Sequence, residues 1–391
     1  MGGLGRRVKI WLLAGALTLI VVETIFILKG RGHLALLEGR RARMEEAIKL
    51  SDRGVLLSRR GEHQAALSAL EGALQLAPRD SLIAANLEAA YYNYGGELIG
   101  QGDYREVLEL SRRGLKVLSR NPALLCLMAE AHYRMDQEDS ALAIIGRIDR
   151  GRADQTVRQR LDWLEPLCRQ ESGLESGESG NFEIRFEGGE DRQLAEEVLG
   201  LLEEIRHRQG VQLGWLTRRP VTVVLYSGRD FADVTRLADW AGAAFDGKIR
   251  LPAGQGRSRA ALERVLAHEF LHALLFEVAG KKFPAWFNEG LAQQQEGRPL
   301  DAGLYLPLAG LKESFMRLDQ PSAVRAYRAS HSAVEFLIGD HGYQLLGMLL
   351  EEMSRGGGFE DNFKEVYGLT VEEFDRRWRE SISGNAGSDG R

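Results

Sequence analysis

The stretch Val265-Leu-Ala-His-Glu-Phe-Leu-His-Ala-Leu-Leu275 guides the interpretation of the whole chain. It contains no Gly or Pro, and Ala, Leu and Glu dominate it, so it predicts one helix. A pitch of 3.6 residues places His268 and His272 on one face, a single turn apart. Two imidazoles at this spacing can share one Zn2+, and Glu269 lies beside them without being a ligand. The other residues are apolar almost all round, which predicts a buried helix.

A second segment supplies a candidate third ligand. Pro284-Ala-Trp-Phe-Asn-Glu-Gly-Leu-Ala292 follows a Gly280-Lys-Lys turn and places Glu289 seventeen residues after His272. This distance allows the first helix to end, the chain to reverse, and a second helix to bring a carboxylate back to the metal. His268, His272 and Glu289 would leave a fourth tetrahedral position for water, which is typical of a catalytic rather than a structural zinc site.

The two segments together resemble a known family. His268-Glu269-x-x-His272 followed by Trp286-x-Asn288-Glu289-Gly290-Leu291-Ala292 is similar to the gluzincin metallopeptidases, and most specifically to the bacterial peptidase MA-like family. The resemblance covers residues 181–380. It implies a zincin-like fold, Zn2+ as cofactor and a peptide or protein substrate. Glu269 is then expected to act as the general base, which takes a proton from the attacking water and passes it to the leaving amine.

Two further expectations depend on the resemblance. The family often has a Tyr and a Ser in a segment like 323–339, which here contains Tyr327 and His331 one helical turn apart. Either side chain can donate a hydrogen bond to a developing oxyanion; the alternative is a surface Tyr and a capping His. Zincins also commonly pair extended substrate with an edge strand beside the metal helix. Gly247–Leu251 is the candidate for that strand, and an ordinary sheet strand is the alternative.

Composition excludes some other classes. The chain has 391 residues, of which 44% are hydrophobic, so there is room for two or three domains with real cores. Its net charge of -5 gives no reason to expect a nucleic-acid partner. Cys126 and Cys168 are too few for a disulfide framework.

The N-terminus predicts a membrane anchor over residues 1–30. Residues 1–9 are basic, and the run Ile10 to Leu28 is apolar except for Glu23 and is long enough to span a bilayer. No A-x-A site follows it, which favours an uncleaved anchor over a signal peptide. Basic residues flank both ends, so they do not select an orientation. The resemblance implies a bacterial cytoplasmic membrane with the N-terminus on its cytoplasmic side and the catalytic domain on its periplasmic side.

Residues 44–171 are expected to form helical repeats. The turn that begins Gly61-Glu-His-Gln-Ala recurs at Gly102 after 41 residues, and again at Asp136 after 34 more. This spacing is similar to that of about three tetratricopeptide (TPR) repeats. Stacked helix pairs present a surface for a partner protein, and a plain helical spacer is the alternative.

Residues 172–180 are rich in Gly and Ser and are predicted to be a linker. Beyond them, 181–186 and 220–226 have the pattern of strands, so we expect a zincin-like domain over 181–380 with few contacts to the helices before it. The tail 381–391 is expected to be disordered. The predicted fold class is therefore α+β and mostly helical, with a transmembrane helix, a TPR-like solenoid and a zincin-like domain containing a small sheet.

The predicted function is that of a membrane-anchored zinc metallopeptidase. Two alternatives belong to other classes: a TPR adaptor whose zincin domain binds peptide without turnover, and a zinc amidohydrolase acting on a non-peptide amide. Glu269 argues against the adaptor, since a domain without turnover would be free to lose its base.

Overall fold

A computed structural model describes residues 37–189, 191–226, 243–253, 258–297, 304–315 and 318–385. The predicted anchor over residues 1–30 lies outside these ranges. Within them, no helix combines the length and apolarity needed to cross a membrane. Residues 381–385, predicted to begin a disordered tail, instead complete the last helix, α14 (Val371–Asn385).

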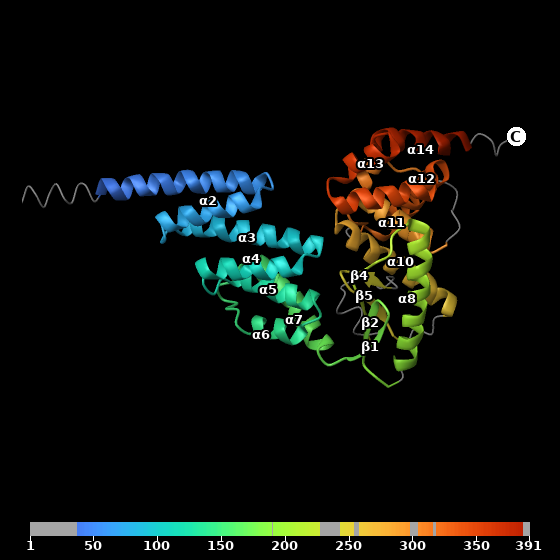
Figure 1. Cartoon of the computed structure of the whole chain (residues 1–391), viewed down its shortest axis with the longest axis horizontal. Helices are drawn as coiled ribbons and strands as arrows, with labels where there is room; N and C mark the ends of the chain where they lie inside the picture. The colour runs from blue at the N-terminus through green and yellow to red at the C-terminus, as the bar shows by residue number, and fades with distance from the viewer. Residues whose placement is uncertain are drawn as a thin grey trace, which may run out of the picture. The chain divides into compact units, whose positions relative to one another are not determined.

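The chain divides into two compact units (Figure 1). The first consists of residues 1–94 with 113–119, and the second of 95–112 with 120–391. Helices α3 (Ser81–Gln101) and α4 (Tyr104–Val117) contribute to both units. The unit boundary therefore falls among the helices rather than at the predicted linker.

The first unit is helical. Residues 37–59 form one helix, and α2 (His63–Leu76) packs against it through a buried face that includes Ala66 and Leu70. The two helices approach closely at Gly54, where an added Cβ would lie 2.5 Å from the Leu70 side chain. Farther along the unit, Arg113 donates two hydrogen bonds of 2.9 Å to the Glu71 carboxylate, so a salt bridge joins α2 and α4.

The turns at Gly61, Gly102 and Asp136 share one conformation, as their spacing predicts. Their φ angles are 76°, 78° and 58°. In each turn, the N–H of the named residue donates a hydrogen bond to the carbonyl of the residue three positions earlier. The N–H of the following residue donates to the carbonyl five positions before that following residue. This left-handed turn ends one helix and starts its partner. The helical pairs are thus present, while their assignment to the tetratricopeptide class remains a prediction.

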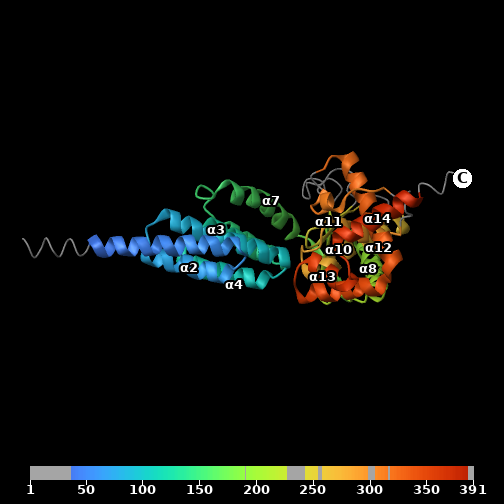
Figure 2. The same cartoon turned by 90° about the horizontal axis from the view of Figure 1, so that it is seen from above.

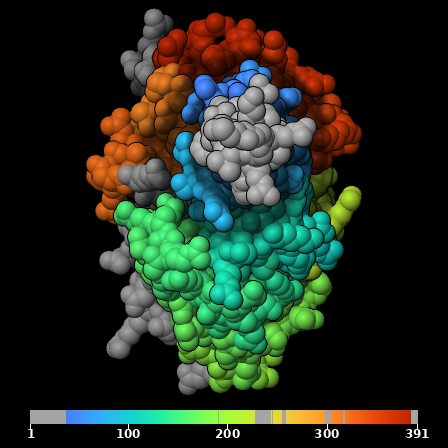
Figure 3. All heavy atoms as spheres, turned by 90° about the vertical axis from the view of Figure 1, so that its left-hand side faces the viewer, coloured from blue at the N-terminus to red at the C-terminus, as the bar shows by residue number. Residues whose placement is uncertain are grey.

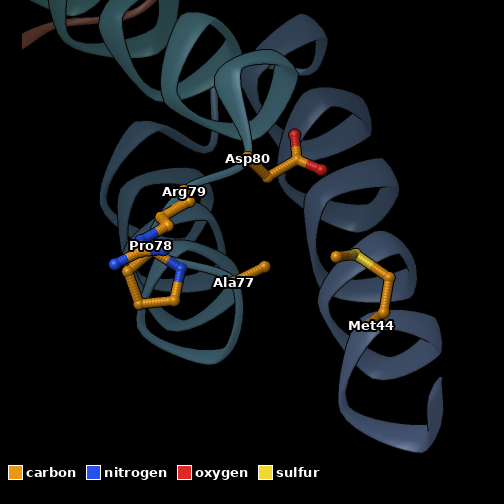
Figure 4. Close-up of a pocket in the computed structure, with 5 residues that line it drawn as sticks. All are labelled: Met44, Ala77, Pro78, Arg79 and Asp80. Carbon is orange, nitrogen blue, oxygen red and sulfur yellow. The ribbon is translucent and has the colours of Figure 1, made fainter. Parts of the chain in front are cut away.

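The first unit also has an open hollow, lined by Met44 and the turn Ala77–Asp80 (Figure 4). Asp80 is its one acidic side chain. The Asp80 carboxylate accepts hydrogen bonds of 3.0 Å from the backbone N–H groups of Leu82 and Ile83, so it caps the start of α3. Its charge is used in folding, and the hollow lacks the convergent polar groups of a ligand site.

The second unit is built around a five-stranded sheet of order β1-β2-β3-β5-β4. β2, β3 and β5 run parallel to one another, while β1 and β4 pair antiparallel at the two edges. The strands are β1 (Glu175–Ser179), β2 (Phe182–Phe186), β3 (Val221–Tyr226), β4 (Ala244–Phe245) and β5 (Ile249–Pro252). The helices with the 3-10 turn η1 are α5 (Pro122–Arg134), α6 (Glu138–Ile145), α7 (Gln155–Glu171), α8 (Asp191–Leu213), α10 (Arg259–Ala279), α11 (Ala285–Gln295), η1 (Leu308–Leu311), α12 (Gln320–Arg355), α13 (Phe359–Tyr367) and α14.

Two expectations about this sheet were wrong. The predicted linker 172–180 contains β1, which pairs with β2 over its full length. Its Gly and Ser residues suit an edge strand that needs few packed side chains, which is why its composition resembles a linker. The candidate substrate strand 247–251 overlaps β5, which lies between β3 and β4 and is not an edge of the described sheet.

One face of the sheet is apolar and packs against α8 and α10 (Figure 1). Figure 2 shows α8, α10, α11 and α12 gathered in the same part of the chain. Alternate residues of the central strands, among them Val223, Leu225, Ile249 and Leu251, are almost fully buried in this core. α10 therefore lies directly on the sheet, and the helix that carries the two candidate ligands has a rigid support.

The opposite face of the sheet is charged and equally buried. Lys248 directly precedes β5 and Arg250 lies within it. Both side chains extend from this face, and each residue is 1% exposed. The Lys248 ammonium lies 2.8 Å from Glu138 and 2.9 Å from Glu171, and the Arg250 guanidinium lies 2.6 Å from Glu171. Tyr226 of β3 donates a hydrogen bond of 2.5 Å to the same Glu171 carboxylate. Helices α6 and α7 thus neutralise the charges of the sheet.

These ion pairs overturn the expectation that few contacts join 181–380 to the preceding helices. α5, α6 and α7 belong to the same compact unit as the sheet. Figure 3 views the chain from the side on which α6 and α7, in green, form a continuous surface. Burial opposes the charged form of Glu171, yet Arg250 and Lys248 hold its pKa down at about 2.

The C-terminal helices hold α11 in place through aromatic packing. Trp286 of α11 is fully buried and stacks on Phe374 of α14 with ring centroids 5.9 Å apart. Phe359 and Phe363 of α13 meet the same indole edge-on at 5.8 and 6.5 Å. Aromatic contacts of this kind fix orientation as well as burying area.

We predict that Glu171→Gln destabilises the second unit by about 3 kcal/mol, because it leaves the buried charges of Lys248 and Arg250 without their shared partner. Urea unfolding of the full chain measures the change. The matched control is Glu165→Gln on the same helix, since Glu165 pairs with the exposed Arg150 and Arg169. It should cost less than about 1 kcal/mol, and equal losses would contradict this account.

The pH dependence has a definite sign. Because folding lowers the pKa of Glu171 from 4.5 to about 2, its contribution is complete above pH 4.5 and is lost as the pH falls towards 2. The wild-type chain should therefore lose more stability across that interval than Glu171→Gln does.

Candidate metal centre

The first two candidate ligands lie on α10, a 21-residue helix with defined ends. Ser258 caps its start by accepting a hydrogen bond from the Ala261 N–H at 3.3 Å. Gly280 ends it at a φ of 60°. Between these ends, the rings of His268 and His272 lie one turn apart, with centroids separated by 4.7 Å and planes inclined by 79°. As the sequence predicts, they share one face.

Glu289 reaches the two imidazoles from α11. Its Oε2 lies 3.6 Å from the Nε2 of His268 and 3.6 Å from the Nε2 of His272. The next residue, Gly290, explains how α11 can lie so close to α12. A Cβ there would lie 2.3 Å from the backbone oxygen of Ser330, so any other residue would push the two helices apart.

These three residues fit a tetrahedral metal ion. Their ligand atoms all lie within 4.8 Å of one another. Bonds of about 2.0 to 2.1 Å to zinc place the atoms of a tetrahedral set roughly 3.3 Å apart. The observed 3.6 Å between Nε2 and Oε2 is a few tenths of an ångström wider, so small side-chain movements suffice. All three side chains are 12 to 21% exposed, which leaves the set accessible.

Two residues that the sequence analysis left unassigned fix the imidazoles from behind. The Nδ1 of His272 lies 2.9 Å from the Asn288 side-chain oxygen, and the Nδ1 of His268 lies 2.5 Å from Glu296 Oε1. When each Nδ1 donates its proton to this acceptor, the neutral form of the ring carries its lone pair on Nε2, which faces the shared position. The ligand tautomers are thereby set by the protein.

The position of Glu296 in the sequence indicates that it lies near Glu289. It follows Glu289 by seven residues, which is two helical turns, so the two carboxylates lie on one side of α11. Gln293 lies only one turn after Glu289 on the same helix. In the structure it is Glu296 that contacts His268.

The charges of the site are strongly coupled. Burial disfavours the imidazolium of His268, but hydrogen bonds to Glu289 and Glu296 outweigh it and raise the pKa of His268 to about 10. For Glu289, burial favours the neutral acid, and the charges of His272 and His268 outweigh it and lower the pKa. The protein thus concentrates negative charge around two nitrogen ligands, which favours a divalent cation at their centre.

Glu269 lies on α10 next to His268 and outside the three-residue set. Its side chain is buried, with 7% of the residue exposed, and burial is the main cause of its raised pKa. The neighbouring charges of His268 and His272 act in the opposite direction. A carboxyl group whose pKa is raised towards neutrality is suited to accept and return a proton.

The structure distinguishes between Tyr327 and His331. Tyr327 is half-buried on α12, and its pKa is raised first by burial and then by the negative charges of Glu289 and Glu269. Its hydroxyl therefore lies within the field of the site and keeps its proton. His331 is 4% exposed, and its Nε2 lies 3.5 Å from the Glu335 carboxylate, one turn along the same helix. A catalytic role for either remains a prediction.

The fold and this donor set together define a metallopeptidase-like domain. A family model described as the Peptidase MA superfamily matches residues 207–384. The matched segment begins within α8, ends within α14, and contains every residue of the site. A search of curated proteins found no match.

We predict that Glu296→Ala weakens zinc binding roughly 10- to 100-fold, because the Nδ1–H of His268 loses its acceptor and the ring is no longer oriented. Competition with a zinc chelator measures the affinity. Gln293→Ala is the matched control, since it shortens a polar side chain of the same helix that is only 9% exposed. If both variants bind zinc equally well, Glu296 does not orient the ligand.

Proposed function

We propose that this chain is a zinc-dependent metallopeptidase that hydrolyses peptide bonds in peptide or protein substrates. The observation that carries the proposal is the convergence of His268 Nε2, His272 Nε2 and Glu289 Oε2 on one position, with both imidazoles oriented from behind. Three protein ligands leave one coordination position open, which is typical of catalytic zinc. The match of residues 207–384 to the Peptidase MA superfamily supports the same conclusion.

Zinc held by these three residues would polarise a carbonyl group and lower the pKa of water towards neutrality. Glu269 accepts the proton of the attacking water and donates it to the departing amine. Its buried carboxyl group is suited to both steps because its raised pKa makes it a stronger base than a surface glutamate. Asn288 and Glu296 keep the imidazoles in the tautomer that binds the metal.

We propose Tyr327, rather than His331, as the donor that stabilises the oxyanion. Its pKa is raised, so the phenol retains its proton and remains a hydrogen-bond donor at neutral pH. Extended substrate is proposed to pair with β4, which ends the described sheet on the side of α10. Exposed strand edges bind extended peptides through main-chain hydrogen bonds.

We further propose that residues 10–28 anchor the chain in a bacterial cytoplasmic membrane with the catalytic domain outside. The support is the length of this apolar run and the basic segment before it. Under this proposal the substrates are proteins or peptides that reach the periplasmic face of the membrane.

The first test concerns the base. Glu269→Gln keeps the size of the side chain but cannot accept the proton, so hydrolysis of a denatured protein substrate should fall at least about 1,000-fold with zinc content unchanged. Mass spectrometry of the cleaved termini and atomic absorption measure the two quantities. An active Glu269→Gln enzyme would exclude this mechanism. A wild-type chain that binds zinc and cleaves only non-peptide amides would instead identify an amidohydrolase.

The second test separates the two candidate donors. Tyr327→Phe should lower kcat roughly 100-fold with little change in KM, because the hydroxyl acts on the transition state rather than on bound substrate. His331→Gln should stay within about threefold of wild type. The reverse result would assign the oxyanion contact to His331, and two unaffected variants would remove both from the reaction.

A further inference from the structure

The β4–β5 turn at Asp246–Gly247 is held by side chains from the helical layer that precedes the sheet. Arg134, at the C-terminal end of α5, donates a hydrogen bond to the backbone oxygen of Asp246. The Arg134 guanidinium also lies 3.5 Å from the Asp246 carboxylate. The side chain of Arg134 is 9% exposed, so this contact is buried.

Gly247 shows how closely the helices approach this turn. Its φ is 112°, a conformation that other residues rarely adopt. A Cβ on Gly247 would lie 3.0 Å from Arg134 Nη1 and 3.5 Å from the hydroxyl of Tyr104 on α4. The turn therefore fits between the two helices only because it carries no side chain there.

β4 is too short to hold its own position. It comprises only Ala244 and Phe245, which pair with Arg250 and Ile249 of β5. In the described part of the chain, no strand pairs with its other side. Its direction is thus set by the turn that follows it and by one aromatic contact. Phe245 meets Phe276 of α10 with ring centroids 5.7 Å apart.

The same contact places β4 beside the metal centre. Phe276 follows His272 by four residues, one turn along α10. Any shift of the β4–β5 turn changes the position of this strand relative to the metal ligands. A peptide paired with β4 would be carried with it.

We propose that Arg134 is a positioning residue for substrate binding, which acts by fixing the β4–β5 turn and hence the strand on which the peptide lies. This inference rests on the proposed function, because it takes β4 to be the strand that pairs with substrate. Arg134 contacts no metal ligand, so it governs how substrate is held and not how the bond is broken. The helices α4 and α5 therefore contribute to substrate affinity without facing the metal.

Two variants test the proposal from opposite sides of the contact. Arg134→Met removes the donor, and Gly247→Ala strains the turn and displaces Arg134. Each should raise KM for an unstructured peptide roughly tenfold, the usual cost of losing a hydrogen bond to a charged group. The kcat should remain within about twofold, and zinc content should be unchanged. Full-length protein is used throughout.

Arg160→Met is the matched control. Arg160 binds the same Glu130 that lies 3.6 Å from Arg134, and it stacks over the same Trp163, but its side chain is 40% exposed where that of Arg134 is 9% exposed. Its KM should equal that of wild type. A rise in KM equal to that of Arg134→Met would show that the helical layer, and not the turn, is responsible.

Binding is also measured without turnover, so that the two proposals fail separately. In a Glu269→Gln background, the dissociation constant of the same peptide should rise by the same factor when Arg134→Met or Gly247→Ala is added. If the wild type cleaves no peptide, the proposed function fails while this measurement still tests the turn. An unchanged dissociation constant in folded variants overturns the inference, as does a fall in kcat or zinc content alone. Should Arg134→Met not fold, Arg134→Lys takes its place. It keeps the positive charge but lacks the several N–H donors of the guanidinium, and the same rise in the dissociation constant must appear.

Discussion

The second unit depends on a carboxylate shared by two cations. Glu171 lies between Lys248 and Arg250, and all three are almost completely buried. A buried charge without a partner costs several kcal/mol, so neither the cationic face of the sheet nor the acidic end of α7 is stable alone. This requirement attaches the helices to the charged face of the sheet. It makes α5, α6 and α7 part of the unit that holds the candidate metal centre rather than a support placed before it.

The two faces of one sheet therefore have different tasks. The apolar face supports α10 and so fixes the direction of His268 and His272. The charged face binds α6 and α7, which pack against α5, the helix whose Arg134 holds the β4–β5 turn. α11 is placed independently, by the close approach of Gly290 to α12 and by the aromatic rings packed around Trp286. The metal centre thus depends on elements that are far apart in the sequence, although its ligands are not.

Local features were predictable from the sequence because their periodicity exposes them. The spacing of His268 and His272 and the return of Glu289 follow from helical geometry, and the structure brings these residues together. Glu296 was missed because a glutamate near a helix end usually faces solvent, and only the fold places it against His268. The boundary at 172–180 was wrong for a related reason. An edge strand needs few large side chains, so its composition could not be told from that of a linker.

The charged face of the sheet was hidden for a deeper reason. Lys248 and Arg250 alternate with Ile249, the pattern of a strand with one solvated face, and nothing near them in the sequence indicates burial. Their partners in the helices lie 77 to 110 residues away. The acidic side chains that end α7 and begin α6 are consequently occupied within the second unit. A partner protein that recognises the helices has to use other side chains, so the resemblance to a binding repeat does not by itself identify the binding surface.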